Sequence, residues 1–203
     1  MNALNRSVIR ALLRGCAALA LCLASAAALP CHAAGDDEDA VAVLAKICAE
    51  IRCYPPGTIK VIMGDGTTSE FHSDYSWPIV HDGFVAIYPG VTIFLAGEIV
   101  DGKIVNLRVV DEPATPVNVI KLRMHQEDGK PGTYLTVTNY FPQFIKYRAG
   151  MMLPTGDDIR ATSSCAVMNN GRSSYEHWPH PIFQLILTDF HVADVTDGQI
   201  VCN

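Results

Sequence analysis

The spacing of hydrophobic residues changes once along the chain, close to residue 55. Before that point apolar side chains recur every three or four residues, as on one face of a helix. These positions are Ala40, Val43, Leu44, Ile47, Cys48 and Ile51. The pattern predicts one helix over residues 37–51. Pro55, Pro56 and Gly57 end it, because proline and glycine interrupt helices.

Beyond residue 57 the hydrophobic period is two, which is typical of strands with one buried face. Val105, Leu107 and Val109, for example, alternate with Asn106 and Arg108. The predicted strands cover residues 58–63, 84–88, 91–100, 103–110, 117–126, 133–140, 144–153, 182–192 and 199–202, with a weaker candidate at 68–72.

Asp-Gly pairs mark the turns between several of these strands. Both residues tolerate the positive φ angles that tight hairpins require. The pairs begin at Asp65, Asp82, Asp101, Asp128 and Asp197. The clearest hairpin joins residues 91–100 to residues 103–110 through Asp101 and Gly102.

Eight or nine short strands after one helix predict a mainly β fold, an antiparallel β-sandwich. A barrel is the alternative, but no repeated corner-turning glycine pattern supports closure of the sheet. The chain contains no long repeat and no low-complexity linker. We therefore expect one domain over residues 35–203.

The first 34 residues have the layout of a secretory signal peptide. Arg6, Arg10 and Arg14 precede an alanine-rich apolar run over residues 15–29, and small residues follow it. Cleavage after Ala33 or Ala34 is expected, and an earlier cut after residue 27 or 28 is the alternative. The run is too short and too rich in alanine for a membrane-spanning helix, which needs about 20 apolar residues. The sequence thus predicts a periplasmic or secreted protein with no stable membrane span after cleavage.

The charge of the predicted mature chain argues against two classes of partner. The whole sequence has a formal net charge of −6, from 15 basic and 21 acidic residues. Removing the leader's three arginines would make this −9. Such a chain should repel nucleic acid and anionic membrane surfaces.

Seven cysteines are divided between the leader and the predicted domain. Cys16, Cys22 and Cys31 would leave with the leader, and the four that remain are Cys48, Cys53, Cys165 and Cys202. Four cysteines in an exported chain indicate two disulfides, with three possible connectivities. We favour Cys48–Cys53 at the end of the helix and Cys165–Cys202 at the C-terminal strand. Zinc-bound thiolates are the alternative, although no C-x-x-C pair is present.

The densest group of reactive side chains lies at residues 173–181. Glu176, His177 and His180 could bind zinc or copper, since imidazole and carboxylate groups suit both metals. Pro179 and Pro181 exclude the helix on which metalloproteases present their histidines. The competing interpretation is a rigid loop in which Trp178 packs against the edge of the sandwich, or a ligand surface.

Both tryptophans precede proline, and a tyrosine lies shortly before each. Tyr75 and Trp77 form one such group, and Tyr175 and Trp178 form the other. Rigidly held aromatic rings could stack on a sugar or anchor a partner protein. The simpler interpretation is that the Trp-Pro pairs fill the open ends of the sandwich.

The sequence contains no nucleophile elbow and no phosphate-binding glycine loop. We therefore expect a non-enzymatic binding or structural protein of the cell envelope that needs no cofactor. Its partner would be an envelope protein, a small molecule or a glycan. The alternative is an exported metal-binding protein or metal-dependent hydrolase that uses the zinc or copper site at Glu176, His177 and His180.

Overall fold

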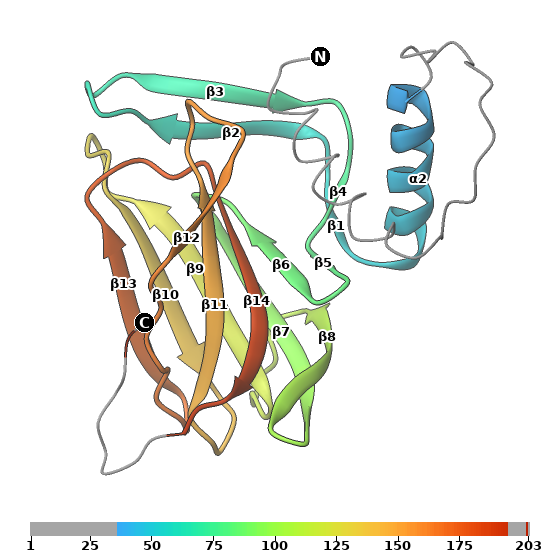
Figure 1. Ribbon diagram of the computed structural model, residues 1–203, viewed down its shortest axis with the longest axis vertical. Coiled ribbons are helices and arrows are strands. Elements are labelled where there is room, and N and C mark those ends of the chain that lie inside the picture. Colours follow the sequence, from blue (N-terminus) through green and yellow to red (C-terminus); the bar gives the residue numbers. More distant parts are fainter. Residues whose placement is uncertain (1–35, 195–201, 203) are drawn as a thin grey trace, which may run out of the picture.

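The computed structural model describes residues 36–194 and residue 202 (Figure 1). The predicted signal peptide lies outside these residues, as does most of the strand predicted at 199–202. The described chain is mainly β, with one helix, α2 (Asp36–Glu50), at its start. The helix and its place before the strands agree with the sequence prediction.

Ten strands form one antiparallel sheet. Along its path the order is β12-β11-β14-β8-β7-β9-β10-β13, and β6 pairs with β14 on one side and with β5 on the other. The strands are β5 (Val80–His81), β6 (Phe84–Ile87), β7 (Val91–Val100), β8 (Lys103–Val110), β9 (Val119–Gln126), β10 (Thr133–Asn139), β11 (Ile145–Met152), β12 (Ile159–Thr162), β13 (Arg172–Trp178) and β14 (Gln184–Val192).

The hairpin of β7 and β8 has the bounds that the sequence predicts. Asp101 and Gly102 form its turn with φ angles of 50° and 76°. Positive φ at both central residues matches the right-handed twist of the flanking strands, which explains the Asp-Gly pair at this position.

The prediction of a loop at residues 173–181 is wrong for most of that segment. Residues Arg172–Trp178 form β13, which pairs with β10 over seven residues. The physical reason is that β13 turns polar Glu176 inward next to Trp178. This inward carboxyl hides the alternation of apolar and polar residues by which strands are found in a sequence.

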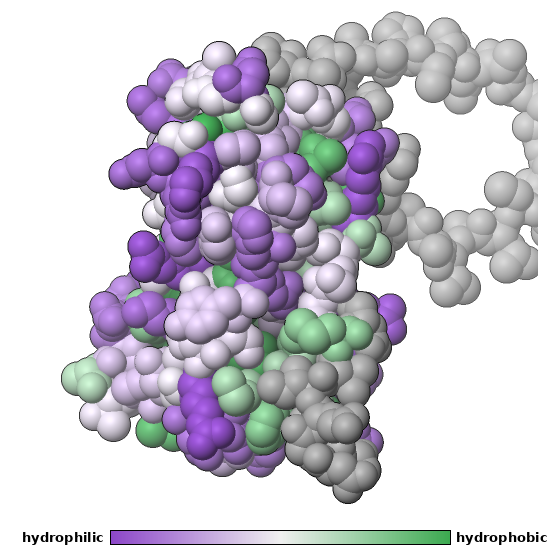
Figure 2. All heavy atoms as spheres, turned by 90° about the vertical axis from the view of Figure 1, so that its left-hand side faces the viewer, coloured by the Kyte–Doolittle hydropathy of each residue, from purple (hydrophilic) through white to green (hydrophobic). Residues whose placement is uncertain are grey.

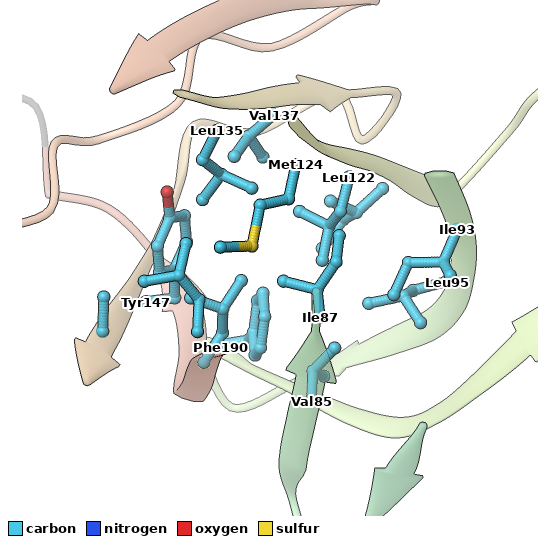
Figure 3. Packing of buried hydrophobic residues seen from close by; sticks show 14 of the residues in the cluster. Val85, Ile87, Ile93, Leu95, Leu122, Met124, Leu135, Val137, Tyr147 and Phe190 are labelled. Atoms are coloured by element: carbon cyan, nitrogen blue, oxygen red, sulfur yellow. The ribbon is translucent and has the colours of Figure 1, made fainter. Parts of the chain in front are cut away.

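The main hydrophobic core lies on the concave side of the sheet. Leu122, Met124 and Leu135 come from β9 and β10, and they meet Tyr147 of β11 and Phe190 of β14 (Figure 3). Contact between strands so far apart in the sheet order requires the sheet to curve strongly. Only one residue pair, His191 with Lys103, joins β14 to β8 at the bend.

A second hydrophobic cluster lies on the outer face of β11 and β14. It is built by α2 and by two small sheets, β1 (Cys53–Tyr54) with β4 (Trp77–Pro78) and β2 (Gly57–Ile62) with β3 (Thr68–Ser73). Leu44, Val61 and Trp77 pack there on Met152 and Phe183. In Figure 1 the β2–β3 hairpin extends across the upper end of the large sheet, with β2 nearer to the sheet.

Both predicted disulfides are present. Cys48–Cys53 ties α2 to β1, and Cys165–Cys202 ties the chain near its C-terminus to the segment after β12. Two disulfides indicate an oxidising compartment. Within the residues that the structure describes, no helix has the length and apolar character to span a membrane.

Candidate functional site

The two tryptophans predicted to bind a ligand lie in different hydrophobic clusters. Trp77 packs in the outer cluster under α2, and its indole donates a hydrogen bond to Ser73 Oγ. Trp178 packs in the main core, and its Nε1 donates to Thr162 Oγ1 over 2.8 Å. Each indole ring is less than 10% exposed, at 7% and 8%. Each tryptophan therefore packs within a hydrophobic cluster.

The two tyrosines do not complete one site with these rings. Tyr175 is 77% exposed on β13, whereas Tyr75 is half-buried before β4. Figure 2 shows the side of the molecule on which β13 lies, and its surface is mainly hydrophilic with small scattered apolar patches. The four residues thus occupy separate places, and their role in binding stays a prediction.

Glu176 and His177 face opposite sides of β13, because consecutive residues of a strand alternate. Glu176 is buried and accepts hydrogen bonds from Tyr147 Oη at 2.6 Å and from the Cys165 amide at 3.4 Å. Burial raises the pKa of this carboxyl, although both hydrogen bonds oppose the rise. The hydrogen bond from the Tyr147 hydroxyl to Glu176 therefore joins β11 to β13.

His177 lies on the outer face and stacks on Tyr134, with 4.4 Å between ring centroids. His125 stacks on the other side of Tyr134 at 5.3 Å. His180, beyond the end of β13, has Nδ1 3.2 Å from the Pro181 carbonyl oxygen. Among residues 36–194 and 202 no three His, Cys, Asp or Glu side chains gather as metal ligands. The zinc or copper site therefore stays a prediction that the arrangement of Glu176, His177 and His180 does not favour.

A pocket that the sequence does not predict lies beside Trp77. Its volume is about 110 Å³, and it lies on the outer face of β6, β14 and β11. Trp77, Tyr88 and Met152 line it together with Gln184, while Phe84 and Ile159 are each 44% exposed. Apart from Gln184, His81 and the polar atoms of Trp77 and Tyr88, the side chains that line it are apolar.

Gln184 is the unusual member of this pocket. It is only 2% exposed, and its Nε2 donates to the Tyr88 hydroxyl over 2.8 Å. Its Oε1 is buried without a hydrogen-bond partner. A buried acceptor in this state costs about 1–3 kcal/mol, so most proteins avoid it. The cost makes Gln184 a candidate for binding rather than for packing.

A wider groove of about 670 Å³ lies on another side of Trp77, between the β2–β3 hairpin and the large sheet. Thr58, Lys60 and Ile62 of β2 line one side, and Val91 and His125 line the other. Its volume falls in the range of about 300–1,000 Å³ that is usual for ligand sites.

Gln126 connects the two sides of this groove. Its Oε1 accepts from the Ile62 amide over 2.8 Å, and its Nε2 donates to the Ile62 carbonyl over 3.1 Å. Nearby, His125 Nδ1 is buried without a hydrogen-bond partner, and burial lowers the pKa of this imidazole. The residues that line the groove thus include Gln126, which binds the backbone of Ile62, and His125, whose Nδ1 has no hydrogen-bond partner.

The sequence-based predictions include neither the pocket nor the groove, although the sequence contains one signal for the pocket. Gln184 is the single polar residue in the apolar run of residues 182–187. A lone amide within such a run marks a buried polar group that needs a partner. Gln126 gives no such signal, because it ends a strand next to acidic residues and looks like an ordinary surface position.

Comparison of the chain with protein-family models, with curated proteins and with solved structures finds no match.

Proposed function

We propose that this protein is an exported, non-enzymatic binding protein whose ligand is a small, mainly apolar molecule that carries a hydrogen-bond donor. One observation carries the proposal: Gln184, whose side-chain Oε1 is buried without a hydrogen-bond partner, is one of the residues that line an apolar pocket. The predicted leader and the two disulfides support export.

The pocket sets the size and the apolar character of the ligand. An engineered apolar cavity of about 150 Å³ binds benzene, so about 110 Å³ suits a molecule, or the end of a chain, of about six heavy atoms. Exposed Phe84 and Ile159 at the pocket leave room for a longer tail to extend outward. Burial of the apolar part against Trp77 and Met152 would provide most of the affinity.

Gln184 sets the polar requirement. Its amide nitrogen is already used by Tyr88, which leaves the carbonyl oxygen as the free group. A ligand hydroxyl or amine would satisfy this oxygen, and an ether oxygen would be repelled by it. A hydrogen bond of this kind contributes about 1 kcal/mol, which is close to a fivefold change in affinity.

The rigidity of the fold supports a preformed site. The two edge strands of the large sheet contact each other where Trp178 of β13 donates to Thr162 of β12. We propose that the curved sheet works as a β-sandwich held together at this seam. Such a scaffold would keep β6, β14 and β11 fixed under the pocket while a ligand enters.

Three molecules of six heavy atoms test the proposal: pentan-1-ol, methyl butyl ether and hexane. Titration is followed in the ¹H–¹⁵N spectrum, where the chain's two indoles give two signals. Each molecule should shift the Trp77 signal and leave the Trp178 signal in place. Pentan-1-ol should bind about fivefold more tightly than the ether.

Gln184→Met keeps the side-chain volume and removes the amide, so this variant should bind pentan-1-ol and the ether about equally and hexane more tightly than either. The control is Gln143→Met, since Gln143 is exposed and lies away from the pocket. A Trp77 signal that no molecule moves would overturn the proposed pocket. A preference for the ether would overturn the assignment of Gln184 as an acceptor.

A further inference from the structure

We propose that the groove beside β2 binds an extended polypeptide segment of a partner protein, which adds to β2 as a third strand of the hairpin. The inference is independent of the pocket at Gln184. It rests on the hydrogen-bond register of β2 and on the contacts of Gln126.

The register of the hairpin fixes which backbone groups of β2 face the groove. Met63 donates to the Thr67 carbonyl over 2.7 Å, so that pair forms ladder bonds. Residues of an antiparallel pair alternate between bonded and non-bonded positions. The pair Ile62 with Thr68 is therefore non-bonded, and so are Lys60 with Glu70 and Thr58 with His72.

In a non-bonded pair the N–H and C=O groups point away from the partner strand. Gln126 confirms this direction for β2, because it binds both the amide and the carbonyl of Ile62 on the side away from β3. Lys60 and Thr58 lie two and four residues earlier on the same edge. Their backbone groups accordingly point into the groove, where no described strand pairs with them.

Gln126 shows what kind of group this edge accepts. Its side-chain amide makes both bonds that the opposite residue of an antiparallel neighbouring strand would make, one to the Ile62 N–H and one to the Ile62 C=O. Next to it the edge continues through Lys60 and Thr58 without such a partner. A peptide backbone is the ligand that repeats this pairing along a strand.

The groove walls indicate the side chains of that peptide. One side carries the apolar rings of Tyr54, Trp77 and Tyr88 and the side chain of Val91. The other side is the edge of β2. An extended segment therefore places alternate apolar residues on the rings and polar residues outward. His125, whose Nδ1 lacks a hydrogen-bond partner, also lines the groove.

The test uses a library of capped eight-residue peptides that alternate apolar and polar residues. The strongest binder is labelled, and its affinity for the full exported domain is measured by fluorescence anisotropy. Lys60→Pro removes one N–H that faces the groove and no hydrogen bond between β2 and β3. Edge strands tolerate proline at positions of this kind. This variant should weaken binding about tenfold.

Glu70→Pro is a matched control. It removes an N–H on the far edge of the hairpin, and both variants break the same exposed Lys60–Glu70 ion pair. It should change the affinity less than about twofold. If Lys60→Pro fails to fold, the unchanged protein is titrated with peptides methylated at alternate backbone nitrogens. One of the two methylation patterns should then abolish binding, since only alternate amides face β2.

Three results would overturn the inference. The first is that every peptide binds more weakly than about 1 mM. The second is that the two proline variants, or the two methylation patterns, weaken binding equally. The third is a dimer in sedimentation velocity that Lys60→Pro dissociates, which would make a second copy of this chain the occupant.

Discussion

At the residue scale the informative positions are polar side chains inside a β protein. Gln184 and Glu176 are each less than 10% exposed, at 2% and 9%. The sequence identifies both as polar, and it signals burial only for Gln184, which interrupts an apolar run. Burial depends on which strands pair and on which face each residue takes, and both are decided by tertiary contacts. For this reason the sequence suggested Glu176 as a metal ligand, whereas its carboxyl accepts a hydrogen bond from a tyrosine hydroxyl.

Glu176→Gln should make the protein less sensitive to pH. Burial raises the pKa of Glu176, so over a window above its ordinary value the folded state holds a proton that the unfolded chain has released. The free energy of unfolding of the parent therefore falls as pH rises through this window. The glutamine variant has no such proton and should be more stable than the parent by about 1 kcal/mol at alkaline pH.

Thermal unfolding at about pH 5 and about pH 8 measures this difference, which should reach about 2–4 °C at the higher pH and shrink at the lower. Glu70→Gln is the control, because Glu70 is an exposed carboxylate on β3. The explanation fails if the two variants respond to pH in the same way.

At the scale of elements, prediction succeeded where local signals and tertiary contacts agree. The hairpin of β7 and β8 has a turn that needs Asp101 and Gly102, so its bounds are visible in the sequence. The predicted alternation fails at one point, because a register shift between Ala96 and Glu98 buries Ile104 in the core in place of Val105. The two-residue strands β1, β4 and β5 carry no periodic signal, because two residues cannot establish a period. Their existence depends on partners supplied by the rest of the fold.

The contact of the β2–β3 hairpin with the large sheet depends on Gln126. Gln126→Ala removes two bonds to Ile62 and one to the Pro131 carbonyl at 2.8 Å. We expect a loss of about 1–3 kcal/mol in the free energy of unfolding and faster hydrogen exchange at the Ile62 amide. The Met63 amide should exchange as before, since its bond to Thr67 lies within the hairpin.

Chemical denaturation and residue-resolved hydrogen exchange measure these effects. Gln143→Ala makes the same chemical change at an exposed position. Equal exchange rates for the Ile62 amide in the parent and in Gln126→Ala would contradict the role given to this side chain.

At the scale of the whole molecule, the sequence predicts the covalent framework better than the binding site. Four cysteines, their spacing and the predicted leader suffice for both disulfides. The pocket arises where the N-terminal elements cover the outer face of β6, β11 and β14, and the groove arises where the β2–β3 hairpin meets the start of β7 and the end of β9. Each of the two sites is lined by several segments that are far apart in the sequence, so no local pattern of residues can predict it.

The two disulfides should differ in their contribution to stability, because they close loops of different length. Their sequence separations are 5 for Cys48–Cys53 and 37 for Cys165–Cys202. The loop-entropy relation gives about 2 kcal/mol for the first and about 4 kcal/mol for the second. We therefore expect the double variant Cys165→Ser with Cys202→Ser to lose more free energy of unfolding than Cys48→Ser with Cys53→Ser.

Urea unfolding of the two double variants, beside the oxidised and the reduced parent, measures both contributions. The reduced parent serves as the control for the serine side chains, since it opens both bridges and changes no residue. The opposite ranking would show that packing of α2 on the outer cluster, held by Cys48–Cys53, outweighs the entropy of the longer loop. Hydrogen exchange in α2 would then rise in the Cys48→Ser and Cys53→Ser variant before the β-sheet opens.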